Sequence, residues 1–389
     1  MTKKWSSRLT FFAFVVLMVG LGSNDSLRGI FSTIFQEHFS LTTTQLGLIV
    51  TASYIGNLVF LLVGGNLSTR FSKKRVLQVL ILIWMAALAL FAFTSNYTVL
   101  LIGMALALGS STLLNTTMNL ITPLLFATAP GFFVNFLFFT QEIGTSGSQY
   151  ILGSHADGFA FWQHTNLVLL ILGAVAFVLL LFCNVPEEAA APADAPAQKG
   201  GYDWRIIMPY VLVFGFYFIA EHGVMNWMVA YGVDGLGLPQ ASAAKYLSVF
   251  FGGMMIGRLC LSPLVDKLGA LKSLAAFGGV SCVLYLIGSL GGAVTMPVWA
   301  ISGLSFSILY PTLVMSIRLY FPAQQVSGAA GTILSIASLA DILFNVGFGK
   351  LVDMTGYAVS IRVLPLSALA FFIVFMLFTK FCKPTQKLK

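Results

Sequence analysis

Charged residues are scarce in this sequence of 389 residues: Lys and Arg number 21, Asp and Glu number 13, and together they make up 9% of the chain. A soluble domain carries about 25% charged residues, so this sequence lacks the charges needed to cover a water-exposed surface. Hydrophobic residues make up 58% of the chain, and Phe alone occurs 35 times. The composition excludes a soluble single-core enzyme, a disordered chain and a nucleic-acid-binding protein, and it predicts a protein that crosses a bilayer repeatedly.

Cysteines and catalytic motifs are equally sparse. The four cysteines fall in or at the ends of apolar stretches and have no Cys-x-x-Cys spacing, so the pattern favours neither disulfides nor a metal site. The sequence has no Walker loop, no Gly-x-Ser-x-Gly turn and no His or Cys cluster with metal-ligand spacing. We therefore expect no enzyme activity, no metal, no cofactor and no ATP-driven pump built on this chain alone.

Long apolar runs, by contrast, are abundant. A membrane-spanning helix needs about 20 mostly apolar residues, and turn residues and charges divide the chain into twelve such segments. We predict spans at residues 9–33, 44–67, 75–95, 98–126, 130–152, 165–184, 206–233, 241–264, 271–290, 294–319, 326–350 and 360–381. Residues 185–204 are rich in Ala, Pro and charge and are typical of a flexible linker. We expect an N-terminal six-helix bundle at 1–184, a cytoplasmic linker at 185–204 and a C-terminal six-helix bundle at 205–389.

The basic residues predict the orientation. If the N-terminus is cytoplasmic, 17 of the 21 Lys and Arg residues fall in cytoplasmic loops and ends, and Arg28, Lys245, Lys350 and Arg362 are the remainder. Lys and Arg concentrate on the cytoplasmic side of membrane proteins. This bias explains the net charge of +8 without a nucleic-acid partner and predicts that both termini are cytoplasmic.

The two halves resemble each other at a fixed offset of 197 residues. Asn24 then falls on Glu221, Leu41 on Leu238, Gly56 on Gly253, Leu67 on Leu264, Arg70 on Lys267 and Arg75 on Lys272. The shared register across the first three helices of each half indicates an internal duplication.

The loop after the second predicted helix carries a family signature. Residues 65–75 read GNLSTRFSKKR, which resembles the G-x-L-x-D-R-x-G-R-K loop of the major facilitator superfamily, with Thr69 in place of the acidic residue and Ser72 in place of the second glycine. The equivalent loop of the second half, 262–269 (SPLVDKLG), keeps that acidic residue and that glycine. The resemblance implies an all-α membrane fold of twelve helices in two pseudo-symmetric six-helix bundles.

A narrower resemblance is to the fucose-permease-like sugar transporters of that superfamily. The Asn-Asp pair of that group's first helix is matched by Asn24 and Asp25, and Asn119 matches its fourth-helix Asn, whereas Asn115 stands where the group has a Glu. The seventh and eighth helices also match relatives of this group, at Glu221, Trp227, Tyr231, Gly257 and Arg258.

These resemblances imply a secondary active transporter that moves a small polar solute by alternating access. The first expectation is proton-coupled uptake of a sugar or similar solute across a bacterial inner membrane, by a monomer whose partners are the solute, protons (or another cation) and the lipid bilayer. The alternative is an exporter of drugs or metabolites from the same superfamily, which the many aromatic residues would also serve.

Four carboxylates lie near the middle of predicted helices, at Asp25, Glu142, Glu221 and Asp341. A charge at the centre of a bilayer costs about 2.5–3.5 kcal/mol even on the lenient insertion scale, so each of these carboxylates requires a structural or functional explanation. The four fall on two pairs of repeat-related helices, the first and seventh and the fifth and eleventh. Scattered core polarity would not recur in this way, and in the superfamily these helices line an aqueous path.

We expect proton coupling at Asp25, with Arg28 and Glu142 as further members of the coupling site. In apolar surroundings the charged form of a carboxylate is disfavoured, which lets it take up and release a proton near neutral pH. Arg28 follows three residues later on the same helical face, so proximity to Arg28 would switch the proton affinity of Asp25. The alternative is a permanent structural pair between Asp25 and Arg28.

We expect solute binding by a second set of residues. Carboxylate and amide groups bind hydroxyl groups, and an aromatic ring packs against the apolar side of a pyranose. The set is Glu221, Asn226, Trp227, Asn115, Asn119, Asp341 and Asn345. Trp227 can instead be an interfacial belt residue, and His222 is more typical of an interhelical hydrogen bond than of a proton relay.

Overall fold

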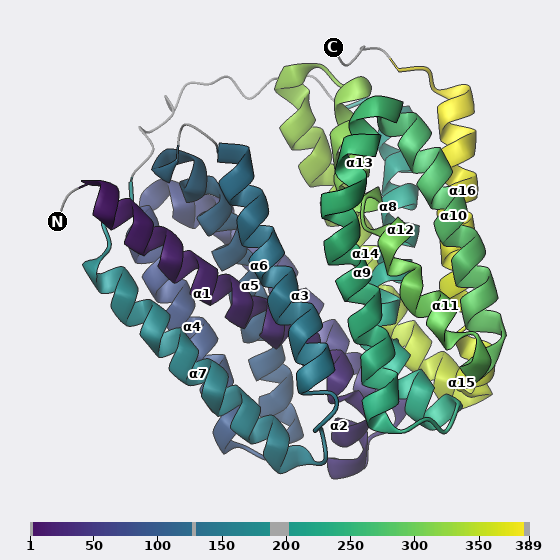
Figure 1. Ribbon diagram of the computed structural model, residues 1–389, viewed down its shortest axis with the longest axis horizontal. Helices are drawn as coiled ribbons and strands as arrows, with labels where there is room; N and C mark the ends of the chain where they lie inside the picture. Colours follow the sequence, from purple (N-terminus) through teal and green to yellow (C-terminus); the bar gives the residue numbers. More distant parts are fainter. Residues whose placement is uncertain (1–2, 127–129, 187–201, 385–389) are drawn as a thin grey trace. The chain divides into compact units, whose positions relative to one another are not determined.

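The computed structural model describes residues 3–126, 130–186 and 202–384, which form helices joined by short connections and contain no β-strand (Figure 1). The chain divides into two compact units, Met1–Gln198 and Lys199–Lys389, called here the N-terminal and C-terminal units. Most of the predicted linker, residues 187–201, lies outside the described residues.

The N-terminal unit contains six long helices and one short one. Its elements are α1 (Lys3–Ile30), α2 (Ser32–His38), α3 (Thr43–Arg70), α4 (Lys73–Phe93), α5 (Tyr97–Leu125), α6 (Pro130–Ile151) and α7 (Phe159–Phe182). Side chains cap three of the helix starts: Thr42 Oγ1 accepts a hydrogen bond from the Gln45 amide, Ser72 Oγ accepts one from the Arg75 amide, and Asn96 Oδ1 accepts one from the Val99 amide. These caps satisfy amides that have no partner inside the helix.

The C-terminal unit also contains long helices, and several short helical segments lie between them. Its elements are α8 (Trp204–Ala230), η1 (Tyr231–Gly235), α9 (Gln240–Leu268), α10 (Ala270–Leu290), η2 (Gly292–Val294), α11 (Met296–Ile301), α12 (Gly303–Phe306), α13 (Leu309–Ser316), η3 (Ile317–Leu319), α14 (Ala323–Thr355), α15 (Tyr357–Ser360) and α16 (Val363–Phe381).

Ten helical segments of the described chain are long and apolar enough to cross a membrane. The other two predicted spans are occupied by α3 and α6, which are 28 and 22 residues long. The prediction of an all-α membrane protein with twelve spanning helices is therefore confirmed.

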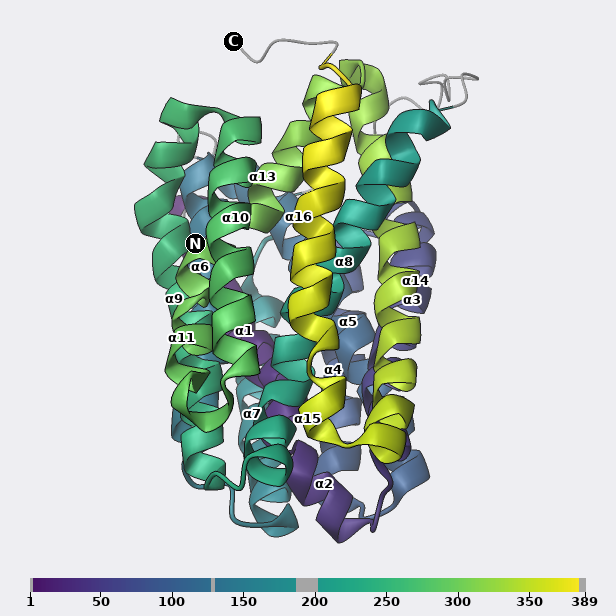
Figure 2. The ribbon, with the colours of Figure 1, turned by 90° about the vertical axis from the view of Figure 1, so that its right-hand side faces the viewer.

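The same helix pairs form in both units. In the N-terminal unit α1 packs on α6, α3 on α5 and α4 on α7, which are the first and fifth, second and fourth, and third and sixth spans (Figure 1). In the C-terminal unit α8 packs on α14, α9 on α11 and α12, and α10 on α16, which are the equivalent pairs (Figure 2). This repeated pairing is what an internal duplication produces.

The span predicted as one helix at 294–319 is broken into η2, α11, α12, α13 and η3. Serine hydroxyls in this segment bond to backbone carbonyls three residues earlier: Ser302 to Trp299, Ser305 to Ser302 and Ser307 to Leu304. Such side-chain bonds compete with the regular α-helical ladder. Hydrophobicity predicts the length of the span but not these breaks.

Candidate functional site: two polar clusters inside the spanning helices

Helices α1 and α6 approach each other closely because glycines form their contact. A Cβ atom at Gly22 would collide with the backbone oxygen of Gln141, and one at Gly144 would collide with that of Val19. Ser23 Oγ also donates across the contact to the Gly144 carbonyl over 3.3 Å. Small residues at helix contacts allow this approach within membranes, and it holds the polar residues of α1 and α6 next to one another.

Asp25 lies at the centre of the N-terminal cluster. It is half-buried, and Ser111 on α5 donates a hydrogen bond to its Oδ2 atom over 3.2 Å. The guanidinium of Arg28 is within electrostatic range of the carboxylate. Arg28 is 6% exposed and lies over the ring of Tyr54 on α3, 5.4 Å from its centroid. The predicted neighbours Asp25 and Arg28 thus share one site, which also includes residues of α3 and α5.

A line of amides continues this cluster along α5. Asn115 Nδ2 donates to Gln141 Oε1 over 2.6 Å, and Asn119 Nδ2 donates to Asn115 Oδ1 over 2.6 Å. Ser111, Asn115 and Asn119 follow one another at four-residue spacing, so they share one face of α5. Glu142 is half-buried on α6 and points about 100° around the helix from Gln141.

The chemistry of the N-terminal cluster combines one ionisable carboxylate with several amide donors and acceptors. The carboxylate can accept a proton. Each amide can donate and accept hydrogen bonds, as a polyhydroxylated ligand requires. A cation beside the carboxylate stabilises its charged form.

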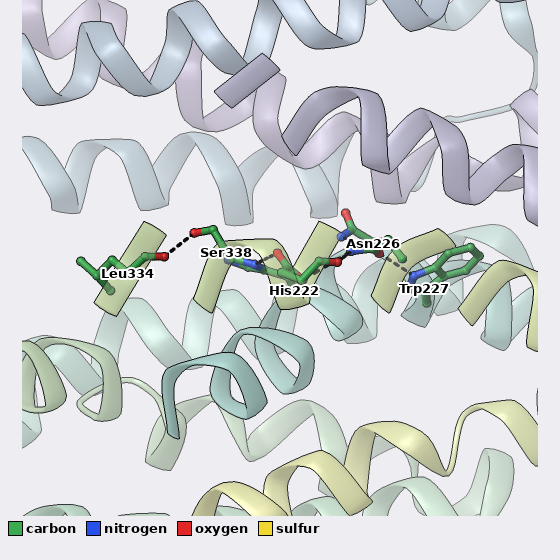
Figure 3. Close-up of polar contacts among 7 residues, drawn as sticks. His222, Asn226, Trp227, Leu334 and Ser338 are labelled. Atoms are coloured by element: carbon green, nitrogen blue, oxygen red, sulfur yellow. Dashed lines mark hydrogen bonds and ion pairs between the residues drawn. The ribbon is translucent and has the colours of Figure 1, made fainter. Parts of the chain in front are cut away.

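The C-terminal cluster joins α8 to α14 (Figure 3). His222 Nδ1 lies 2.6 Å from Asp341 Oδ2. Asn345 Nδ2 donates to Asp341 Oδ1 over 3.3 Å, and Trp227 Nε1 donates to Asn345 Oδ1 over 2.9 Å. Asn226 Nδ2 makes a longer contact of 3.5 Å with the same Asn345 oxygen. The structure therefore brings together four of the predicted binding residues and adds His222.

Trp227 is fully buried in this cluster. Its ring is 0% exposed and packs against Phe348, with the ring centroids 4.9 Å apart. Its indole nitrogen is occupied by Asn345. The side chain therefore holds Asn345 in place, and a direct contact of its ring with a ligand stays a prediction.

Glu221 does not join Asn226 and Trp227, with which the sequence analysis groups it. Its charge acts on the phenol groups of Tyr217 and Tyr310, and the guanidinium of Arg258 on α9 acts on the same two phenols. Glu221 and Asn226 are five residues apart, which separates their directions by about 140° around a helix. Helical phase thus turns Glu221 toward the tyrosines and turns Asn226 toward α14.

Sequence reasoning missed Ser111 and Gln141 and assigned His222 no functional role. Two signals were available. Ser111 precedes Asn115 and Asn119 at the same spacing, and a mid-membrane Asp341 needs a partner. Within the described residues no group of three or more His, Cys, Asp or Glu side chains is placed to hold a metal ion.

Two curated relatives are sugar transporters by name. The L-fucose-proton symporter of Escherichia coli (strain K12) is 24% identical over 333 residues, which cover 74% of this chain and 75% of the relative. The glucose/galactose transporter of Brucella abortus is 27% identical over 344 residues, which cover 82% of this chain and 81% of the relative.

Solved structures share the fold. The xylose transporter of E. coli, in an inward open conformation, matches with a TM-score of 0.78 and 14% identity, covering 97% of this chain and 96% of that chain. A family model, the Major Facilitator Superfamily, matches residues 10–339. Because that match spans well over half of the chain and the relatives are membrane transporters, this protein is a multi-pass solute transporter rather than an enzyme, and it belongs to the Major Facilitator Superfamily.

Proposed function

We propose that this transporter takes up a monosaccharide, or a similar polyhydroxylated solute, together with protons across a bacterial inner membrane. The names of two relatives, a fucose-proton symporter and a glucose/galactose transporter, support this class of solute. Both termini would be cytoplasmic, as the basic residues predict. The unit that carries out transport would be the monomer, with residues 185–204 as the linker between its bundles.

The observation that carries the proposal is the N-terminal cluster. The carboxylate of Asp25 is hydrogen-bonded to Ser111 beside the amides of Asn115, Asn119 and Gln141, all within spanning helices. A carboxylate within a membrane span costs free energy unless it has a function or a partner. A proton on Asp25 removes this cost, and the neighbouring amides can bind the hydroxyl groups of a sugar.

Arg28 supplies the switch in this proposal. Its charge stabilises the ionised form of Asp25, so a small displacement of the guanidinium changes how readily Asp25 binds a proton. Alternating access requires such a change, because a symporter must bind its proton on one side of the membrane and release it on the other. Glu142, half-buried on α6, is the second candidate for the proton.

The C-terminal residues would complete solute recognition. Asn226, Asp341 and Asn345 belong to the α8–α14 cluster, and Glu221 lies on a different face of α8, near Tyr217. Carboxylates and amides are the groups that bind sugar hydroxyls with directional hydrogen bonds. Trp227 would act by positioning Asn345.

The test is uptake by the purified protein in proteoliposomes. Radiolabelled L-fucose, D-glucose, D-galactose and D-xylose are offered with and without a pH gradient that is acidic outside. The proposal predicts that at least one sugar accumulates above equilibrium only when the gradient is present. Equal uptake in both conditions contradicts proton coupling, and loss of preloaded sugar under the same gradient indicates an exporter. Failure of every sugar to move contradicts the solute class.

A further inference from the structure

The His222–Asp341 contact is the shortest link between α8 and α14 in the C-terminal cluster (Figure 3). The two side chains differ in access: His222 is 26% exposed and Asp341 is 2% exposed. The imidazole also stacks on the ring of Phe218, with the centroids 5.3 Å apart and the planes 6° from parallel. The pair therefore has one buried carboxylate and one imidazole through which a proton can arrive.

Both carboxylate oxygens of Asp341 have a hydrogen-bond partner. Its Oδ2 atom faces His222, and its Oδ1 atom accepts from Asn345 Nδ2, which also donates to the Asp341 backbone oxygen over 2.9 Å. Trp227 Nε1 fixes the Asn345 amide in turn. A carboxylate oriented by such outer partners presents one oxygen to the imidazole in a fixed direction.

The other charged groups near α8 and α14 fall into two sets. The first is Glu221 with Arg258, which are directed toward Tyr217 and Tyr310. The second consists of exposed residues at or near helix ends on α8, on α14 and on the elements that pack against them, namely Asp203, Arg205, Asp234, Lys245, Lys267, Arg318, Lys350, Asp353, Arg362 and Lys380. Lys350 follows Asp341 by nine residues, or about 13 Å of helix rise. Within this unit, His222 is thus the basic group in direct contact with Asp341.

The charge state of this pair strongly affects the free energy of burying it within the membrane. With a neutral imidazole the pair carries one net negative charge, on a carboxylate that is almost fully buried. Binding of one proton makes the pair net neutral, with the 2.6 Å contact still in place. A lone buried charge is far more costly than a paired one, and histidine is the side chain whose ordinary titration range lies closest to neutral pH.

The internal repeat supplies a second, independent observation. At the offset of 197 residues, Asp25 falls on His222. Asp25 contacts a neighbouring helix through Ser111, as His222 does through Asp341. The first helix of each half therefore carries a titratable side chain at the same position.

We propose that His222 and Asp341 form a proton-binding site of the C-terminal unit, distinct from Asp25, whose protonation strengthens the attachment of α8 to α14. The ligand of this site is a single proton shared between imidazole and carboxylate. Its role in transport rests on the proposed symport function, whereas its titration does not.

The direct test is histidine NMR on the full-length protein in lipid nanodiscs, labelled with ¹⁵N-histidine. The chain has four histidines, so the signal lost in His222→Gln identifies His222. We expect this signal to titrate between about pH 5 and 8, the range of histidine side chains. In Asp341→Asn its midpoint should move by about one pH unit or more, the size of shift that a close charge causes. Ser338→Ala is the matched control, since Ser338 lies one turn from Asp341 and donates to Leu334 instead (Figure 3).

Two results would overturn the proposal. One is a His222 signal that stays constant over this pH range, which would mean that the His222–Asp341 pair does not change its protonation state. The other is a titration that Asp341→Asn leaves unchanged. The role in transport has a separate readout: exchange of a transported sugar should depend on pH in the wild type and lose most of that dependence in His222→Gln, which keeps a donor for Asp341. An unchanged pH profile would contradict the role in transport. If no sugar is transported, the symport function fails while the NMR result still decides the proton site.

Discussion

Polar side chains of the two clusters are hydrogen-bonded to one another rather than isolated. Ser111 binds Asp25, Asn115 binds Gln141, and Asn345 binds both Asp341 and Trp227. An unsatisfied polar group costs several kcal/mol in hydrocarbon. Because each set spans two helices, its members position one another. We expect single substitutions to affect different properties, such as proton coupling or stability.

Asp25→Asn is expected to separate binding from coupling. The amide has the shape of a protonated carboxylate and cannot release a proton, so uphill accumulation under a pH gradient should disappear while sugar exchange continues at a reduced rate. Uptake and exchange in proteoliposomes measure the two properties. Ser111→Ala is the control, because it removes the hydroxyl partner and leaves the carboxylate. Undiminished uphill uptake by Asp25→Asn would move the proton site to Glu142.

Trp227→Phe is expected to act on stability. The ring is kept, but Asn345 loses its 2.9 Å donor, and a buried acceptor that loses its partner costs about 1–3 kcal/mol. Trp227→Ala should cost more, about 3–5 kcal/mol, because it also leaves a cavity. Exposure of the buried thiols of Cys183 and Cys282 to a thiol-reactive dye during heating reports unfolding. A Trp227→Phe variant with normal stability and weakened sugar affinity would instead indicate that the ring touches the solute.

At the scale of helices, each unit is built internally from the same pairs of helices, and glycines allow the paired helices to approach closely. Gly22 and Gly144 form the contact of α1 with α6, on which the position of the N-terminal cluster depends. In lipid, such contacts stabilise by van der Waals packing and hydrogen bonds rather than by the hydrophobic effect. A side chain added at the contact should therefore be destabilising.

Gly144→Ala and Gly147→Ala make a matched pair on α6. A Cβ at Gly144 would collide with the Val19 carbonyl, whereas a Cβ at Gly147 meets nothing within 4 Å. We expect Gly144→Ala to lower the unfolding temperature, and Gly147→Ala to keep or raise it, because Ala exceeds Gly in helix stability by about 1 kcal/mol. The thiol-dye assay measures both variants. Equal unfolding temperatures would contradict the close α1–α6 contact.

The length and order of the helices could be predicted from the sequence, but their partners could not. Apolar runs give all twelve spans, whereas α2 and the breaks between Gly292 and Leu319 depend on local serine and glycine contacts. In the same way, Asp25 and Asp341 stand out as mid-helix charges, but periodicity describes only the face of a residue's own helix. It does not identify the neighbour on another helix, so the pairing of Asp25 with Ser111 and of Asp341 with His222 is seen only in the three-dimensional structure.

At the scale of the whole molecule, orientation follows from charge. With 17 of 21 basic residues on one side, the bias predicts cytoplasmic termini and a cytoplasmic linker. The short connection between α6 and α7, in which Asp157 is exposed, would then face the other side of the membrane.

Cysteine labelling tests this orientation. In a variant without the four native cysteines, Ala193→Cys should react with an impermeant maleimide only when the cytoplasmic side is accessible. Asp157→Cys should react only from outside. Open membrane sheets, in which both should react, provide the control. Reaction of both positions from the same side of sealed cells would contradict the twelve-span topology.

Coupling of sugar movement to proton movement is the central claim, and a pH electrode measures it most directly. Proteoliposomes are prepared without any gradient, and a transported sugar is added to a weakly buffered medium. Symport predicts that the medium becomes more alkaline as sugar enters, with about one proton for each sugar if Asp25 alone carries it, and that Asp25→Asn abolishes this change. Sugar entry with no change in external pH, in protein that transports the sugar at the wild-type rate, would contradict the account.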